Sequence, residues 1–174
     1  MKDIMDAINV TGKKIYAVLE NIETGEQQVI PGGNVVTDDG DTYYARSAVS
    51  GVFLTTDFSG LNAGLRLGSA NTAPEKANTD VLTFLVNTIH AADSGYETVG
   101  DTDSDNTGAG VDIVTWRYSY TTAEGNVTTI VEGAIVDNRT TPTKALTRFT
   151  FAAAFTKTST DTLKIFVNHT FNGT

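Results

Sequence analysis

Hydrophobic and polar positions alternate most regularly in the last third of the chain, where residues 111–174 predict four consecutive strands. The clearest apolar rows are Phe149, Phe151, Ala153 and Phe155 in one strand, and Leu163, Ile165 and Val167 in the next. Successive side chains of a strand point to opposite faces of a sheet. Each row therefore predicts a strand with one face turned towards a core.

An aromatic row lies in the first of these four strands. Val114, Trp116, Tyr118 and Tyr120 share one face. Exposed aromatic rings can stack on carbohydrate, whereas rings with a period of two in a mid-domain strand are typical of a core. We favour the core interpretation. A turn at residues 124–126 then leads into a less regular strand over residues 127–136.

The N-terminal part of the chain predicts a hairpin. Residues 14–20 alternate as a strand, and residues 23–25 supply a turn that contains glycine. A second strand over residues 26–30 is expected to end at the Pro-Gly-Gly sequence of residues 31–33, because proline cannot donate a backbone hydrogen bond.

A short helix is expected after the hairpin. Asp41 is the predicted N-cap of a helix over residues 42–50, and Gly51 is the predicted stop. Residues 52–56 then form an apolar strand.

Between residues 60 and 110 the pattern is weaker. A short strand begins at Leu65 and becomes a loop, and residues 81–89 form a candidate strand. Residues 94–110 are rich in Gly, Asp, Ser and Thr and predict a long surface loop used for contact.

These elements predict a mainly β protein, an antiparallel β-sandwich or jelly-roll-like single domain of about eight strands with one short helix. Residues 1–12 are weakly amphipathic and predict an N-terminal arm, and residues 13–174 predict the sandwich domain. Sixteen glycines against three prolines, together with abundant threonine, favour strands joined by tight turns. A length of 174 residues suits one domain.

Composition narrows the possible partners. A net charge of −9 disfavours nucleic acid, because phosphate binding needs clustered Lys and Arg and the 12 basic residues here are scattered. No apolar stretch approaches the length of a membrane span, and the N-terminus has no signal-peptide core, so we expect synthesis in the cytosol and no membrane partner. The absence of cysteine excludes disulfides and thiolate metal sites.

One acidic loop has the spacing of a calcium site. Asp101, Asp103 and Asp105 alternate, and Asp112 stands where the last ligand of a calcium loop would lie. Asn106 replaces the glycine of such loops, however, and no helices flank the sequence. We therefore favour a solvated acidic loop and expect no cofactor, with calcium as the alternative.

The two histidines do not predict catalysis. His169 extends the apolar row of residues 163–167, which favours a buried ring with a backbone partner over a metal ligand or an acid–base group. His90 lies near Asp93, but no serine stands in a nucleophile-elbow sequence. We expect a protein that is not an enzyme. The residues predicted to form interfaces are Ile4, Ile8, Tyr43 and Tyr44.

Two segments carry a family resemblance. Residues 67–80, LGSANTAPEKANTD, are similar to a loop of many small virion proteins of tailed bacteriophages, and residues 155–171, FTKTSTDTLKIFVNHTF, resemble their closing strand. The hairpin of residues 16–30 also resembles hairpins of these virion proteins. The resemblance implies a non-enzymatic β-sandwich that associates with itself and binds a capsid or tail lattice.

Together these observations suggest a capsid decoration, or cement, protein on the outer face of a phage head shell. Its expected partners are the major capsid protein and further copies of itself, as a homotrimer. Its expected location is the virion, after synthesis in the bacterial cytoplasm. The alternative is a tail or fibre component, including a β-sandwich that recognises a receptor.

Overall fold

A computed structural model describes residues 8–50, 57–99 and 113–173 of the chain, with side chains described in 15–50, 57–99 and 113–170. The one helix of these residues is α1 (Asp38–Ser50). Their strands are β1 (Ile8–Asn21), β2 (Gln27–Val36), β3 (Gly64–Gly68), β4 (Thr98–Val99), β5 (Ile113–Tyr120), β6 (Val127–Val136), β7 (Ala145–Lys157) and β8 (Asp161–Gly173). The predicted mainly β class with one short helix is confirmed.

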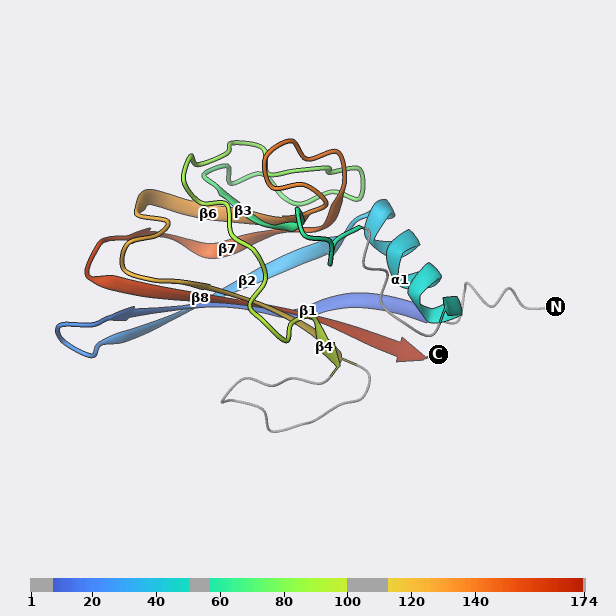
Figure 1. Ribbon diagram of the computed structural model, residues 1–174, viewed down its shortest axis with the longest axis horizontal. Coiled ribbons are helices and arrows are strands. Elements are labelled where there is room, and N and C mark those ends of the chain that lie inside the picture. Colours follow the sequence, from blue (N-terminus) through green and yellow to red (C-terminus); the bar gives the residue numbers. More distant parts are fainter. Residues whose placement is uncertain (1–7, 51–56, 100–112, 174) are drawn as a thin grey trace.

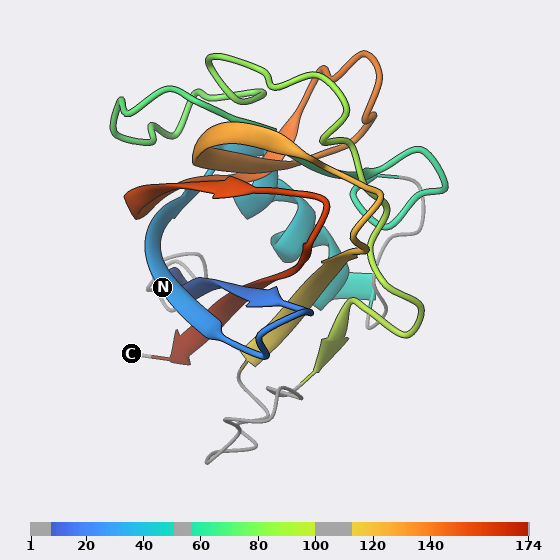
Figure 2. The same cartoon turned by 90° about the vertical axis from the view of Figure 1, so that its left-hand side faces the viewer.

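The strands form one antiparallel sheet in the order β3-β6-β7-β2-β1-β8-β5-β4. This differs from the expected sandwich or jelly roll, because the strands hydrogen-bond in one continuous series and the sheet curls around the core (Figures 1 and 2). Register shifts between β1 and β8 and at three places between β6 and β7 accompany the curl. Such bulges bend a strand and increase its twist. One curled sheet therefore surrounds the core that was expected to lie between two sheets.

The predicted N-terminal arm overlaps this sheet. Strand β1 begins at Ile8, which pairs with Gly173 of β8, so residues 8–12 belong to the sheet and not to an arm. The side chain of the predicted interface residue Ile8 is not described, and Ile4 lies outside the described residues.

The hairpin of β1 and β2 is confirmed, with Gly25 in its turn at a φ of 70°. The strand does not end at Pro31, however, since β2 continues to Val36. Residues 32–36 gain a second partner in β7, and this pairing extends the strand beyond the proline. Gly32 allows the close approach, because a Cβ there would lie 2.9 Å from the carbonyl oxygen of Thr150.

Helix α1 begins four residues earlier than predicted, and its cap is Thr37, not Asp41. The Thr37 hydroxyl accepts a hydrogen bond from the Gly40 amide at 3.1 Å, as an N-cap does. Gly40 brings this first turn against β7, since a Cβ there would lie 2.0 Å from the Leu146 carbonyl oxygen. The helix lies across one end of the curled sheet (Figure 1).

The helix places Tyr43 and Tyr44 in the core, with 1% and 3% of their surface exposed. The prediction that these two tyrosines form an interface was therefore wrong. Both rings lie on the face of α1 that packs into the curl, beside Phe58 and His169.

The core confirms the strand faces predicted from the sequence. Trp116, Tyr118 and Tyr120 are buried, which contradicts the carbohydrate-stacking alternative, and Leu163, Ile165 and Val167 are buried opposite them. In β7, residues 149, 151 and 155 are buried, but Ala153 is exposed. The register against β6 shifts between Ile130 and Glu132, so residues 151–154 bulge out of the regular pattern.

Residues 82–99, here called the bridging segment, connect the two edges of the sheet. The predicted strand over 81–89 forms one single bridge, from Phe84 to Gly68 of β3, and His90 just after it forms another, to Leu65. Asp93 then donates its backbone N–H to the Arg117 carbonyl of β5 at 2.9 Å, and β4 pairs with β5. The segment thus hydrogen-bonds to β3 at one edge of the sheet and to β5 near the other, where its own β4 is the edge strand.

Two further expectations lie outside the described residues: the strand over 52–56 and the part of the long loop over 100–110. Within the described ranges, no helix has the length and apolar character needed to cross a membrane.

Candidate functional site

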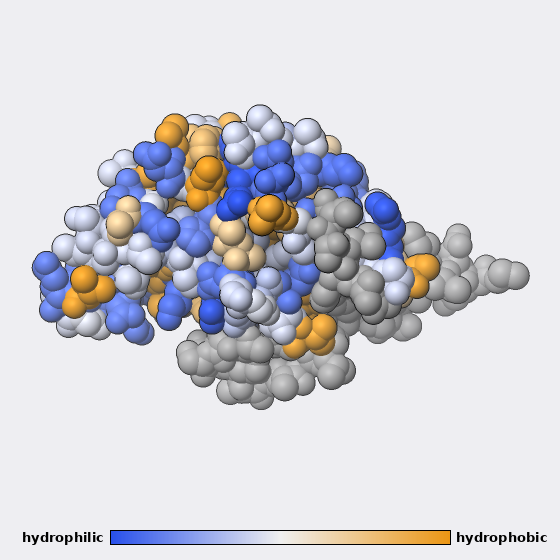
Figure 3. Space-filling model, viewed as in Figure 1, coloured by the Kyte–Doolittle hydropathy of each residue, from blue (hydrophilic) through white to orange (hydrophobic). Residues whose placement is uncertain are grey.

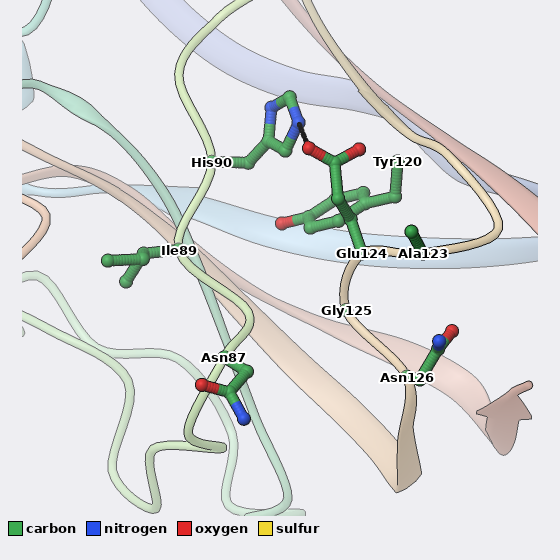
Figure 4. Close-up of a pocket in the computed structure, with 8 residues that line it drawn as sticks. All are labelled: Asn87, Ile89, His90, Tyr120, Ala123, Glu124, Gly125 and Asn126. Atoms are coloured by element: carbon green, nitrogen blue, oxygen red, sulfur yellow. Dashed lines mark ion pairs between the residues drawn. The ribbon is translucent and has the colours of Figure 1, made fainter. Parts of the chain in front are cut away.

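The bridging segment and the turn between β5 and β6 enclose a surface hollow of about 400 Å³ (Figure 4). The segment contributes Asn87, Ile89 and His90, and the turn side contributes Tyr120, Glu124 and Asn126. Sequence reasoning missed this site, because its two sides lie some 30 residues apart and meet only through the curl of the sheet.

His90 is held in place by its backbone and by a ring contact. Its main chain exchanges two hydrogen bonds with Leu65 of β3, at 2.8 and 3.0 Å. Its imidazole packs on Tyr120, with 4.6 Å between ring centroids, and Nδ1 lies 2.7 Å from the carbonyl oxygen of Ala91. Nε2 faces the Glu124 carboxylate at 3.7 Å, too far for a hydrogen bond (Figure 4).

Glu124 has one engaged oxygen and one that faces the hollow. Its Oε2 accepts hydrogen bonds from the backbone N–H and the hydroxyl of Thr121, at 2.9 and 2.8 Å. These two bonds lower the pKa of the Glu124 carboxyl, with a smaller contribution from His90. The carboxylate therefore stays charged at neutral pH, and Oε1 remains directed towards His90.

Four of the eight exposed large hydrophobic side chains of the described residues lie on the bridging segment, namely Leu82, Val86, Ile89 and Val99. The other four are spread over separate elements. The face that carries the segment shows apolar side chains set among polar ones (Figure 3). Their concentration on one segment of an otherwise polar surface makes the bridging segment the candidate contact site.

His169 belongs to a buried polar network, not to a surface site. Asn34 donates to its Nε2 at 3.0 Å and Tyr44 bonds its Nδ1 at 2.5 Å. Trp116 in turn donates to the Tyr44 hydroxyl at 3.1 Å. The ring is buried as predicted, but its partners are side chains and not the backbone. Both ring nitrogens are occupied, which leaves neither for a metal.

The tautomer of His169 follows from these contacts. Asn34 also donates to Thr147, whose hydroxyl donates to the Val35 carbonyl, so the amide nitrogen of Asn34 must face both partners. Nε2 is therefore an acceptor, and the proton of the neutral ring lies on Nδ1. Burial lowers the pKa of His169 to about 3, and the ring stays neutral at ordinary pH.

Asp93 does not pair with His90. Its carboxylate accepts hydrogen bonds from Arg117 Nε at 2.5 Å and from the Ser119 backbone and hydroxyl at 3.0 and 2.6 Å. Asp93 therefore fixes the bridging segment to β5. The part of the chain with described side chains gives the His90 ring only Ala91 and Glu124 as polar partners, without a nucleophile.

A buried ion pair holds the loop that follows β3. Glu132 and Arg148 have fully buried side chains and lie 2.7 Å apart. Glu132 accepts the backbone N–H groups of residues 70, 82 and 83, and Arg148 donates to the carbonyls of residues 72 and 73. Charged residues in the middle of two apolar strands were the sequence signal for this pair, which sequence reasoning missed.

The calcium candidates Asp101, Asp103, Asp105 and Asp112 lie outside the described residues. Among the residues that are described, no group of three or more His, Asp or Glu side chains is arranged to hold a metal ion.

Comparison with protein-family models, with curated proteins and with solved structures finds no match to this chain.

Proposed function

We propose that this protein is a structural component of a bacteriophage virion, a capsid decoration protein that binds the outer face of the head shell and stabilises it. It acts by docking and has no catalytic role. It associates as a homotrimer, because capsid lattices offer threefold positions and repeated subunits form closed cyclic assemblies.

The observation that carries the proposal is the bridging segment. It presents Leu82, Val86, Ile89 and Val99 to solvent, with 52%, 68%, 44% and 55% of their surface exposed. Its backbone is fixed to β3 on one side and to β5 on the other. An apolar contact surface on a rigid backbone loses little entropy when it docks.

The resembling segments and the charge support the same role. Residues 67–80 begin in β3 and continue as the loop held by Glu132 and Arg148, so this loop is a fixed part of the surface. A net charge of −9 suits a protein that faces outwards and disfavours contact with the packaged genome.

A docking assay with matched valine variants tests the proposal. Val86→Asp places a charge in the contact surface, whereas Val29→Asp makes the same change at an exposed valine of β2. We expect Val86→Asp to weaken co-sedimentation with head shells at least tenfold, because the carboxylate must be desolvated on docking. Val29→Asp should bind like the wild type.

Isolated tails serve as the second target in the same assay. Binding to tails and not to head shells would contradict the proposal and favour the tail or fibre alternative. Equal loss of binding in the two variants would contradict the role of the bridging segment.

A further inference from the structure

The hollow beside the bridging segment offers hydrogen-bond acceptors to a ligand. Since Oε2 of Glu124 is occupied by Thr121, Oε1 is the carboxylate oxygen left to face the hollow. Asn87 adds an exposed side-chain amide at the rim, on a backbone with a φ of 70° (Figure 4). An anionic ligand would be repelled by this carboxylate, and a ligand without a donor would leave Oε1 unpaired.

His90 adds a second acceptor through its tautomer. Its Nδ1 lies 2.7 Å from the Ala91 carbonyl oxygen, which can only accept, so Nδ1 carries the proton. In the neutral ring Nε2 is then an acceptor. It lies 3.7 Å from Oε1 of Glu124, so a single donor group placed between them can hydrogen-bond to both atoms.

The nearby Lys157 is not among the residues that line the hollow. The Lys157 amine donates to the Asn126 amide oxygen at 2.8 Å, on a side chain that is 1% exposed. It faces the Asp161 carboxylate as well as Glu124. Glu124 Oε1 is therefore the charged atom that an incoming group meets.

We infer that the hollow receives a basic side chain, Lys or Arg, from the protein on which this chain docks. The inference rests on the proposed docking function and names the partner's chemistry. The basic head would donate to Glu124 Oε1 and His90 Nε2, and its aliphatic stem would lie along Ile89, which is 44% exposed at the rim. Val86 and Leu82 would contact apolar side chains around it. The acidic chain and a basic partner residue are complementary in charge.

Nuclear magnetic resonance with small probes tests this inference without any shell protein. The probes are Nα-acetyl-arginine methylamide, its neutral isostere Nα-acetyl-citrulline methylamide, and maltose. We expect the arginine probe to shift the signals of the His90 ring and the Asn87 side-chain amide saturably. The citrulline probe should bind about fivefold more weakly, as expected for the loss of a partly exposed ion pair.

Three variants identify the atoms involved. Glu124→Gln keeps an acceptor for Thr121 and should weaken binding of the arginine probe about fivefold. Glu26→Gln removes one negative charge from the exposed β1–β2 turn and should leave the binding of the arginine probe unchanged. Asn87→Asp adds a carboxylate at the rim and should strengthen binding. Equal binding of the arginine and citrulline probes, or unchanged binding in Glu124→Gln, would overturn the inference, as would saturable shifts with maltose alone.

This experiment is independent of the shell assay. If the arginine probe fails to bind while Val86→Asp still abolishes docking, the basic-residue inference falls and the proposed function stands. If the wild type does not bind shells at all, the proposed function itself fails.

Discussion

At the scale of single residues, His169 stands out because it joins β8 to three other elements. Its ring nitrogens bond Asn34 of β2 and Tyr44 of α1, and Trp116 of β5 bonds the same tyrosine. Such a network rigidifies a core only while each member stays in its required protonation state. A proton on His169 would turn Nε2 into a donor facing the Asn34 amide.

We predict that His169→Gln flattens the acid dependence of stability. Burial lowers the pKa of His169 from 6.5 to about 3 in the folded protein. The stability linked to the neutral ring is therefore fully present above pH 6.5 and is lost as the pH falls towards 3. Between pH 6 and 4 the wild type should lose about 1.4 kcal/mol per pH unit more than the variant.

Urea unfolding at pH 4, 5, 6 and 7 measures this difference. At pH 7 the variant should be less stable by about 1–3 kcal/mol, because part of the network loses its partners. Parallel profiles of the two proteins would show that His169 does not set the acid dependence.

Sequence reasoning reached the burial of His169 but not its partners. The period of two places the ring on the core face of its strand. Asn34 and Tyr44 lie more than 120 positions away, and no local pattern indicates that the chain brings them together. For the same reason the adjacent tyrosines 43 and 44 were mistaken for surface residues, since α1 packs on the sheet through the face that carries both.

At the scale of elements, the Glu132–Arg148 pair determines how the loop after β3 packs on the sheet. It connects β6 and β7 to backbone groups of residues 70–83. A buried ion pair whose groups are all hydrogen-bonded has little net effect on the free energy of unfolding. Removal of one member, however, leaves an uncompensated charge in the core.

We predict that Arg148→Met destabilises the protein by about 3–5 kcal/mol, because the buried Glu132 carboxylate loses its counter-charge. Lys76→Met is the matched control, since Lys76 pairs with Asp41 at the surface and should contribute about 1 kcal/mol or less. Thermal or urea unfolding measures both.

The double variant Glu132→Gln/Arg148→Met adds a further test. Its loss of stability should be smaller than the sum of the two single losses, because neither residue then leaves a buried charge behind. Equal losses in Arg148→Met and Lys76→Met would contradict a structural role for the buried pair.

Element positions were largely predictable, and their ends were not. The hairpin, β3, β5, β6, β7 and β8 follow from local patterns of apolar residues and turns. The start of α1 was missed because three acidic residues in its first turn each resemble a cap, while the Thr37 hydroxyl makes the capping bond. The end of β2 was missed because pairing with β7 outweighs the break at Pro31.

At the scale of the whole molecule, the sheet order depends on contacts between distant parts of the chain. The N-terminal strand β1 pairs with the C-terminal strand β8, and the bridging segment hydrogen-bonds to both β3 and β5. Periodicity gives the face of each strand but not its neighbour, so a sandwich and one curled sheet are equally consistent with the same pattern. The hollow lies between the bridging segment and the turn from β5 to β6, and it could not be found from the sequence.

The proposed function also belongs to this scale, since decoration of a shell depends on copy number, symmetry and position. Reconstruction of the virion by electron cryomicroscopy, with the native mass of the purified protein, measures all three. We predict density on the outer face of the head at threefold positions, the bridging segment against the shell, and a mass of three times the 18.5 kDa chain. A monomer whose density lies only at the tail would contradict the account.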